Sequence, residues 1–124
     1  MYKHKFALIR SNLLGKIVEW DEGAEEYFGY SGDEALGQSL DLVVPPEFRE
    51  RHWAGFNKVI ETGQCPMDRA TTNVPALCKD GVVRPFPGRF VFLQDARGGV
   101  AGVIGLYTIP QGTETPFGQI LPLN

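Results

Sequence analysis

Short stretches in which apolar and polar residues alternate occur near the start of the chain and again through its second half. Such alternation is typical of strands with one buried face, because successive side chains along a strand point to opposite sides of the sheet. The first two stretches are residues 6–10 and 16–20, and the sequence Asn12-Leu13-Leu14-Gly15 between them is typical of a turn. They predict a pair of strands joined by a short connection.

The second half of the chain predicts three further strands, over residues 72–79, 83–94 and 100–109. Asp80-Gly81 separates the first two and favours a tight hairpin turn. Residues 95–99, which include two glycines, separate the second strand from the third. Consecutive strands joined by short turns pair antiparallel, so this half of the chain predicts a meander.

Between the two groups of strands, apolar residues recur at helical spacing. Residues 24–30 and 33–36 predict two short helices, with Ser31 as a cap for the second. The longest periodic stretch, residues 46–62, begins with proline and is followed by Gly63, which are start and stop signals of a helix. Strands and helices that are segregated in this way predict an α+β domain with a five-stranded antiparallel sheet, short helices and one longer helix.

Composition narrows the class of protein. At 124 residues, with 43% hydrophobic and 22% charged residues, the chain has the composition of one globular domain. The net charge of -3 and the scattered basic residues argue against nucleic-acid binding. No apolar run reaches the roughly 20 residues that span a bilayer, and no secretion signal is present, so we expect a cytoplasmic protein that does not bind membranes.

Little in the sequence suggests catalysis. Cys65 and Cys78 have no CxxC spacing and no second histidine near them, which argues against a structural zinc site or a disulfide framework. With only two histidines in the chain, no Ser-His-Asp arrangement is credible. The chain has no Gly-rich loop with the spacing that binds phosphates. We therefore expect that it is not an enzyme.

Several short sequences accompany the predicted elements in a particular order. They are Gly15-Lys16-Ile17-Val18-Glu19-Trp20, Ala24-Glu25-Glu26-Tyr27-Phe28-Gly29-Tyr30-Ser31, Glu34-Ala35-Leu36-Gly37, Val43-Val44-Pro45-Pro46 and Lys79-Asp80-Gly81. In this order and spacing they resemble the PAS family over almost the whole chain. The resemblance implies five antiparallel strands and helices around a central cavity, which binds a small ligand, haem, flavin or nothing. We expect a PAS sensor domain over residues 1–109 and a tail without regular structure over residues 110–124.

The chain departs from the PAS pattern at two points. Many PAS domains end in an Asp-x-Thr sequence that leads into a signalling helix, whereas this chain has Tyr107-Thr108-Ile109-Pro110. The run of residues that marks flavin photosensors of the family is also missing. We therefore expect signalling through a homodimer or a downstream signalling protein, and no photoactive flavin.

The long helix carries the sharpest candidate for a binding site. Projected at about 100° per residue, it places on one apolar face Phe48, His52, Gly55, Phe56 and Val59. His52 lies in the middle of this face, and an imidazole on an apolar wall is the arrangement that binds haem iron axially. The alternative is a core histidine whose ring is held by a backbone carbonyl.

This helix also resembles that of haem-binding PAS oxygen sensors. Their axial histidine lies as far before the glycine that ends the helix as His52 lies before Gly63. The resemblance implies b-type haem with His52 as the metal ligand. On the opposite wall, the positions that carry a Met ligand or an oxygen-binding Arg in such relatives are Ala70 and Thr72 here.

The strand predicted over residues 83–94 completes the expected cavity, because Gly88, Phe90 and Phe92 alternate onto one face of it. We therefore expect a sensory domain in signal transduction, and haem for gas, oxygen or redox sensing is its most specific version. Two alternatives remain open. One is a PAS domain that binds a small metabolite without a metal, and the other is an interaction or dimerisation module whose cavity is filled by side chains such as Phe90 and Phe92.

Overall fold

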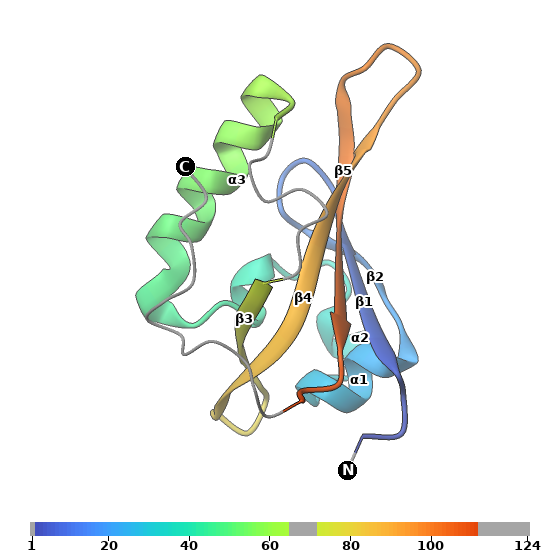
Figure 1. Cartoon of the computed structure of the whole chain (residues 1–124), viewed down its shortest axis with the longest axis vertical. Coiled ribbons are helices and arrows are strands. Elements are labelled where there is room, and N and C mark those ends of the chain that lie inside the picture. Colours follow the sequence, from blue (N-terminus) through green and yellow to red (C-terminus); the bar gives the residue numbers. More distant parts are fainter. Residues whose placement is uncertain (1, 65–71, 112–124) are drawn as a thin grey trace.

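Five strands form one antiparallel sheet in the order β2-β1-β5-β4-β3 (Figure 1). The computed structural model describes residues 2–64 and 72–111, so the predicted tail is described only at residues 110 and 111. The strands are β1 Phe6–Ser11, β2 Ile17–Trp20, β3 Thr72–Leu77, β4 Val83–Gln94 and β5 Val100–Thr108. The predicted α+β fold with a five-stranded antiparallel sheet is confirmed, and the expected strand ends lie within two residues of the observed ones.

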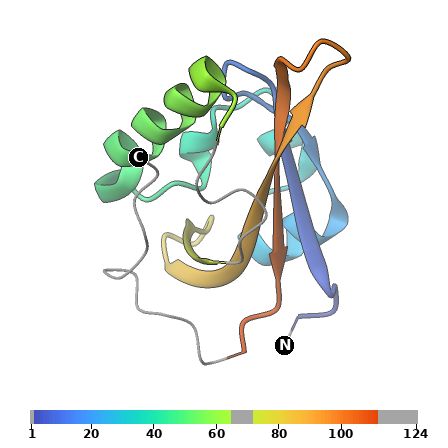
Figure 2. The same cartoon turned by 45° about the horizontal axis from the view of Figure 1, so that its top comes forward.

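The helical elements all lie between β2 and β3 in the sequence. They are α1 Glu22–Phe28, α2 Gly32–Ala35, the 3-10 turns η1 Leu40–Leu42 and η2 Pro46–Phe48, and α3 Arg49–Thr62. Since β2 and β3 are the two edges of the sheet, this segment crosses from one edge to the other over one face (Figures 1 and 2). In Figure 1, α3 lies on the side of the sheet where β3 and β4 are found.

Side-chain caps fix the ends of the short helices. The Asp21 carboxylate accepts a hydrogen bond from the Ala24 N–H at 2.8 Å and caps α1. Ser31 and Glu34 form a reciprocal capping box at the start of α2, which confirms the predicted cap. Each cap satisfies backbone N–H groups that have no partner within the helix.

The long helix begins later than its sequence pattern predicts. Residues 46–48 form the separate turn η2, and Phe48 has φ -107 and ψ -3, so α3 begins only at Arg49. Its end is the predicted one, at Gly63, where φ is 73 and the N–H donates to the carbonyl of Val59. A positive φ of this kind favours glycine.

A cluster of aromatic rings forms the core under α1. Tyr27 stacks on Phe86 with ring centroids 5.1 Å apart, and Phe28 meets Phe86 edge-on at 5.2 Å. Phe28 also meets Tyr107 edge-on at 5.3 Å. Stacked and edge-on pairs are both favourable geometries for aromatic rings. The sheet is therefore tightly covered at its α1 end.

Candidate functional site

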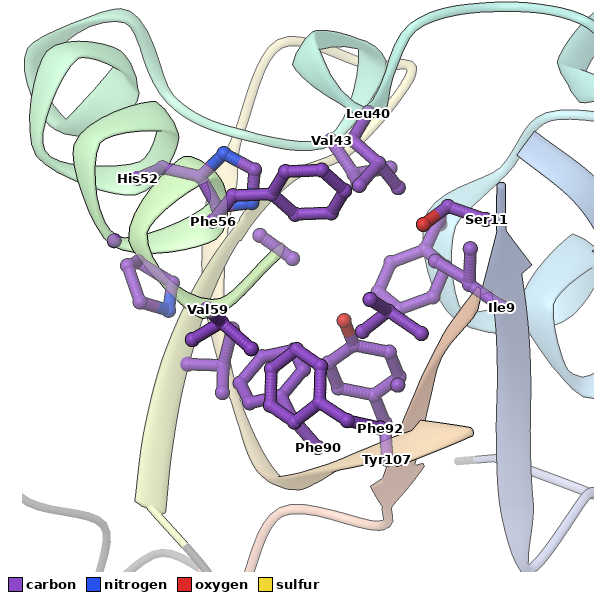
Figure 3. A pocket seen from close by; sticks show the side chains of 17 residues that line it. Ile9, Ser11, Leu40, Val43, His52, Phe56, Val59, Phe90, Phe92 and Tyr107 are labelled. Atoms are coloured by element: carbon purple, nitrogen blue, oxygen red, sulfur yellow. The ribbon is translucent and has the colours of Figure 1, made fainter. Parts of the chain in front are cut away.

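A cavity of about 80 Å³ lies between α3 and the inner face of the sheet (Figure 3). Its lining residues come from every strand except β2 and from four helical or connecting segments. They are Ile9, Ser11, Phe28, Leu40, Val43, His52, Gly55, Phe56, Val59, Val74, Pro75, Ala76, Phe90, Phe92, Val103, Gly105 and Tyr107. One water needs roughly 10–15 Å³ of such space. The cavity is therefore large enough for a few waters or for one compact molecule.

Six of the residues predicted for the site line this cavity together. His52, Gly55, Phe56 and Val59 come from α3, and Phe90 and Phe92 come from β4. The first four share a face because α3 is a regular helix over this stretch. Figure 3 shows His52, Phe56 and Val59 on one side of the cavity and Phe90 on another.

Three other predicted residues are described and do not line the cavity. Phe48 lies in η2 before α3 begins, where the Arg51 guanidinium lies 5.9 Å from the centre of its ring. The helical projection therefore does not apply to it. Thr72 and Gly88 face each other across β3 and β4. Ala70, the remaining predicted residue, lies outside the described residues.

Tyr107 is a cavity residue that the sequence did not single out. Its hydroxyl points into the cavity (Figure 3). Glycines make room for the ring, because a Cβ at Gly105 would lie 2.7 Å from the Tyr107 oxygen and one at Gly88 would lie 2.8 Å from its Cδ1. Burial raises the pKa of Tyr107 above its usual value, so the hydroxyl keeps its proton and can donate. The recurring glycines on the inner face of β4 and β5 are the sequence signal for this residue.

Ser11 is the second residue that sequence reasoning missed, since the first strand was predicted to end at Arg10. The strand continues because Ser11 pairs with Val103 of β5 and with Ile17 of β2. Ser11 is 1% exposed and lines the cavity, and its Oγ is buried without a hydrogen-bond partner among the residues that the structure describes. Figure 3 shows this oxygen on the cavity wall opposite α3.

The His52 ring lies among aromatic side chains. Trp53 meets it edge-on at 4.7 Å, and Phe56 lies 6.0 Å away. Burial lowers the pKa of His52 to about 4, and the opposing effect of Asp41 is smaller. The Nδ1 atom is buried and has no hydrogen-bond partner in the described part of the chain, so no backbone carbonyl of that part holds the ring through it. The imidazole is therefore neutral at pH 7, with one nitrogen that donates and one that accepts.

Polar contacts near its start attach α3 to the segments before it. The indole Nε1 of Trp53 donates to the Asp41 carboxylate at 2.7 Å, and the Arg49 Nε donates to the Val44 carbonyl at 3.0 Å. The Trp53 ring also covers Gly15 in the turn between β1 and β2, where a Cβ would overlap the ring. These contacts hold the His52 wall of the cavity in place.

The described residues include no group of three or more His, Cys, Asp or Glu side chains that could hold a metal ion. None of the helices described here has the length and hydropathy of a membrane-spanning segment.

Comparison with known proteins identifies the family. A family model for the PAS fold matches residues 17–107. The chain belongs to the PAS family. The match begins with β2 and ends in β5 at Tyr107, and it includes α3 and most of the cavity wall. The resemblance stated from the sequence is thereby confirmed.

Two curated relatives are much longer than this PAS domain. An uncharacterized protein of Azorhizobium caulinodans is 31% identical over 94 residues, which are 75% of this chain and 12% of the relative. A probable serine/threonine-protein kinase of Dictyostelium discoideum is 32% identical over 79 residues, which are 64% of this chain and 5% of the kinase. The chain therefore spans a small fraction of the length of the curated relatives it matches.

Solved structures of other PAS domains share the fold. The PAS domain of a Colwellia psychrerythraea protein has a TM-score of 0.72 at 22% identity, covering 86% of this chain and 87% of that one. The RpfR quorum-sensing receptor PAS domain of Cronobacter turicensis, in complex with C12:0, has a TM-score of 0.67 at 18% identity, covering 86% and 94%. Drosophila melanogaster Cycle PAS-B with bound ethylene glycol has a TM-score of 0.66 at 16% identity, covering 84% and 99%.

Proposed function

We propose that this PAS domain is a sensor that binds one compact small molecule in the cavity between α3 and the sheet. The observation that carries the proposal is an apolar cavity with two buried polar atoms on its wall, the Oγ of Ser11 and the Nδ1 of His52, that have no hydrogen-bond partner among the described residues. Folded proteins leave few buried polar atoms unpaired, because each costs about 1–3 kcal/mol. A bound molecule would supply the missing partners.

Two of the structural neighbours hold small molecules, C12:0 in RpfR and ethylene glycol in Cycle. At 18% and 16% identity they share the fold with this chain, and their ligands are their own. They support the proposal in one respect, since the PAS fold accommodates small molecules of different kinds. We propose that occupancy is passed to a homodimer partner or a downstream signalling protein, with no catalytic step in this domain.

Haem, the most specific expectation from the sequence, fits this cavity poorly. His52 supplies an imidazole, but the cavity volume of about 80 Å³ is far below the roughly 300–1,000 Å³ of sites for drug-sized ligands. A porphyrin needs a site at least as large as those. No Lys or Arg is among the described lining residues, so the propionates would lack a cationic partner. Haem is therefore not part of the proposed function. A visible spectrum after haem addition, with His52→Ala as the control, would test directly whether the domain binds haem through His52.

The proposed function can be tested by filling the cavity. Val103 lies on central strand β5, is 7% exposed and lines the cavity, so Val103→Phe should occupy the space that a ligand needs. Val18 on β2 is 38% exposed, so Val18→Phe makes the same change on the surface. Amide chemical shifts would be followed by NMR during titration with small neutral probes, including 1-butanol and xenon.

We expect saturable shifts at α3 and β5 in the unmodified protein and in Val18→Phe, and their loss in Val103→Phe. Val103→Phe should fold, because the added ring can enter the existing cavity, which keeps the cost of overpacking to about 1–3 kcal/mol. Equal shifts in the two variants would contradict binding in this cavity.

A further inference from the structure

Three polar side chains line the otherwise apolar cavity, and they come from three different elements. Ser11 lies in β1, His52 in α3 and Tyr107 in β5. Figure 3 shows Ser11 and His52 on opposite sides, with the Tyr107 hydroxyl directed between them. A molecule inside the cavity would therefore meet a polar group on more than one side.

The three groups share one chemical property, which is that each can donate or accept a hydrogen bond without carrying charge. A hydroxyl does both, and a neutral imidazole has one nitrogen of each kind. Burial keeps the pKa of His52 near 4 and that of Tyr107 above its usual value, so both are neutral at pH 7. None of the described lining residues is Asp, Glu, Lys or Arg.

We infer that the cavity selects a compact neutral molecule that carries a hydroxyl or carbonyl group, and that it rejects the corresponding carboxylate. This inference rests on the proposed function. An alcohol or carbonyl would pair with Ser11, His52 or Tyr107, and its alkyl part would contact the apolar wall. A carboxylate would lose its water shell and find no cation, which is costly for any buried ion.

His52 is the group whose binding role can be separated from a structural one. Its Nδ1 has no hydrogen-bond partner within residues 2–64 and 72–111, so replacing the ring with phenyl removes a polar atom that is unpaired there. Such a change is neutral or stabilising when the shape is kept. A histidine that served only the fold would lower the melting temperature when replaced, whereas one that binds ligand would lower affinity alone.

The experiment compares 1-butanol with butyrate, which have nearly the same shape and differ in charge. Dissociation constants at pH 7 would be measured from NMR amide shifts in the unmodified protein, His52→Phe and Tyr107→Phe. We expect 1-butanol to bind at least about tenfold more tightly than butyrate. Each variant should weaken 1-butanol binding by roughly two- to tenfold, the effect of one hydrogen bond. Xenon, which forms no hydrogen bonds, should bind all three proteins alike.

The outcomes separate this inference from the proposed function. Butyrate binding within about threefold of 1-butanol would overturn the inference alone, as would 1-butanol affinity that neither variant changes. Xenon binding with no response to 1-butanol would also overturn the inference, but it would still show that the cavity admits a small molecule. No response to any of the three probes would overturn the proposed function as well.

Discussion

Among single residues, the two histidines have opposite electrostatic environments. His52 is buried against Trp53 and Phe56, and burial lowers its pKa to about 4. The His4 ring lies 2.7 Å from the Glu26 carboxylate, and that hydrogen bond raises the pKa of His4. The folded protein therefore favours the neutral form of His52 and the charged form of His4.

These environments predict opposite effects of pH on stability. The folded protein binds a proton at His52 less tightly than the unfolded chain does. The contribution of His52 to the free energy of unfolding is therefore present above about pH 6.5 and is lost as the pH falls toward about 4. Between pH 7 and pH 5 this loss amounts to about 2 kcal/mol. The His4 contribution is present below about pH 6.5 and is lost as pH rises through the raised pKa.

Urea unfolding at pH 5 and pH 7 would measure both effects. His52→Phe should lose less stability than the unmodified protein when the pH is lowered from 7 to 5. His4→Gln should lose more, because it lacks the group that stabilises at low pH. Identical pH dependence in all three proteins would show that neither ring changes its protonation on folding.

At the scale of elements, local signals in the sequence predicted most of what the structure contains. Ser31 and Gly63 act at the expected helix ends, and Gly81 has the positive φ of 85 that the predicted hairpin turn requires. Alternation predicted the strands, and helical period placed His52 on the cavity wall. These features depend on residues close together in the chain, so a single sequence shows them.

The missed features depend on contacts between distant segments. Ser11 belongs to β1 because two neighbouring strands pair with it, and Tyr107 reaches the cavity because glycines in β4 and β5 leave room for its ring. No local pattern around Ser11 contains that information. For Tyr107 the sequence signal is the recurring glycines, whose effect depends on how β4 and β5 pair. Phe48 does not line the cavity because it belongs to the separate turn η2. The helical spacing of apolar residues continues through this turn, so the sequence pattern does not reveal it.

A testable contact between elements is the one that joins α3 to the turn between β1 and β2. Gly15 has φ 75 and lies under the Trp53 ring, whereas Gly37 has φ 85 and no atom of the described residues within 4 Å of a built Cβ. Alanine at either position costs about 1–2 kcal/mol from the left-handed backbone. Gly15→Ala should cost about 1–3 kcal/mol more, because the methyl group displaces Trp53.

Urea unfolding measures the two costs, and tryptophan fluorescence should change only in Gly15→Ala. Equal stability and unchanged fluorescence in both variants would show that Trp53 does not hold α3 in the way described.

At the scale of the whole molecule, the inner face of the sheet has a packed end and a hollow end. Rings from α1, β4 and β5 fill the packed end, and Phe86 is 0% exposed there. The hollow end lies under α3 and contains the cavity. Phe28 and Tyr107 belong to both, since they pack in the core and line the cavity. Stability should therefore depend mainly on one end and ligand binding on the other.

The same substitution at two positions of β4 tests this division. Phe86 stacks on Tyr27 and meets Phe28 edge-on, so Phe86→Ala would open a void in a filled region and should destabilise the fold by about 3–5 kcal/mol. Phe90 is only partly buried and already borders empty space, so Phe90→Ala should cost roughly half as much or less.

Phe90→Ala should also enlarge the cavity, so it should admit neutral probes larger than 1-butanol that the unmodified protein excludes. Urea unfolding and NMR titration measure the two properties separately. If Phe90→Ala destabilised the protein as much as Phe86→Ala and left probe size selection unchanged, the two ends would not differ in the way the cavity implies.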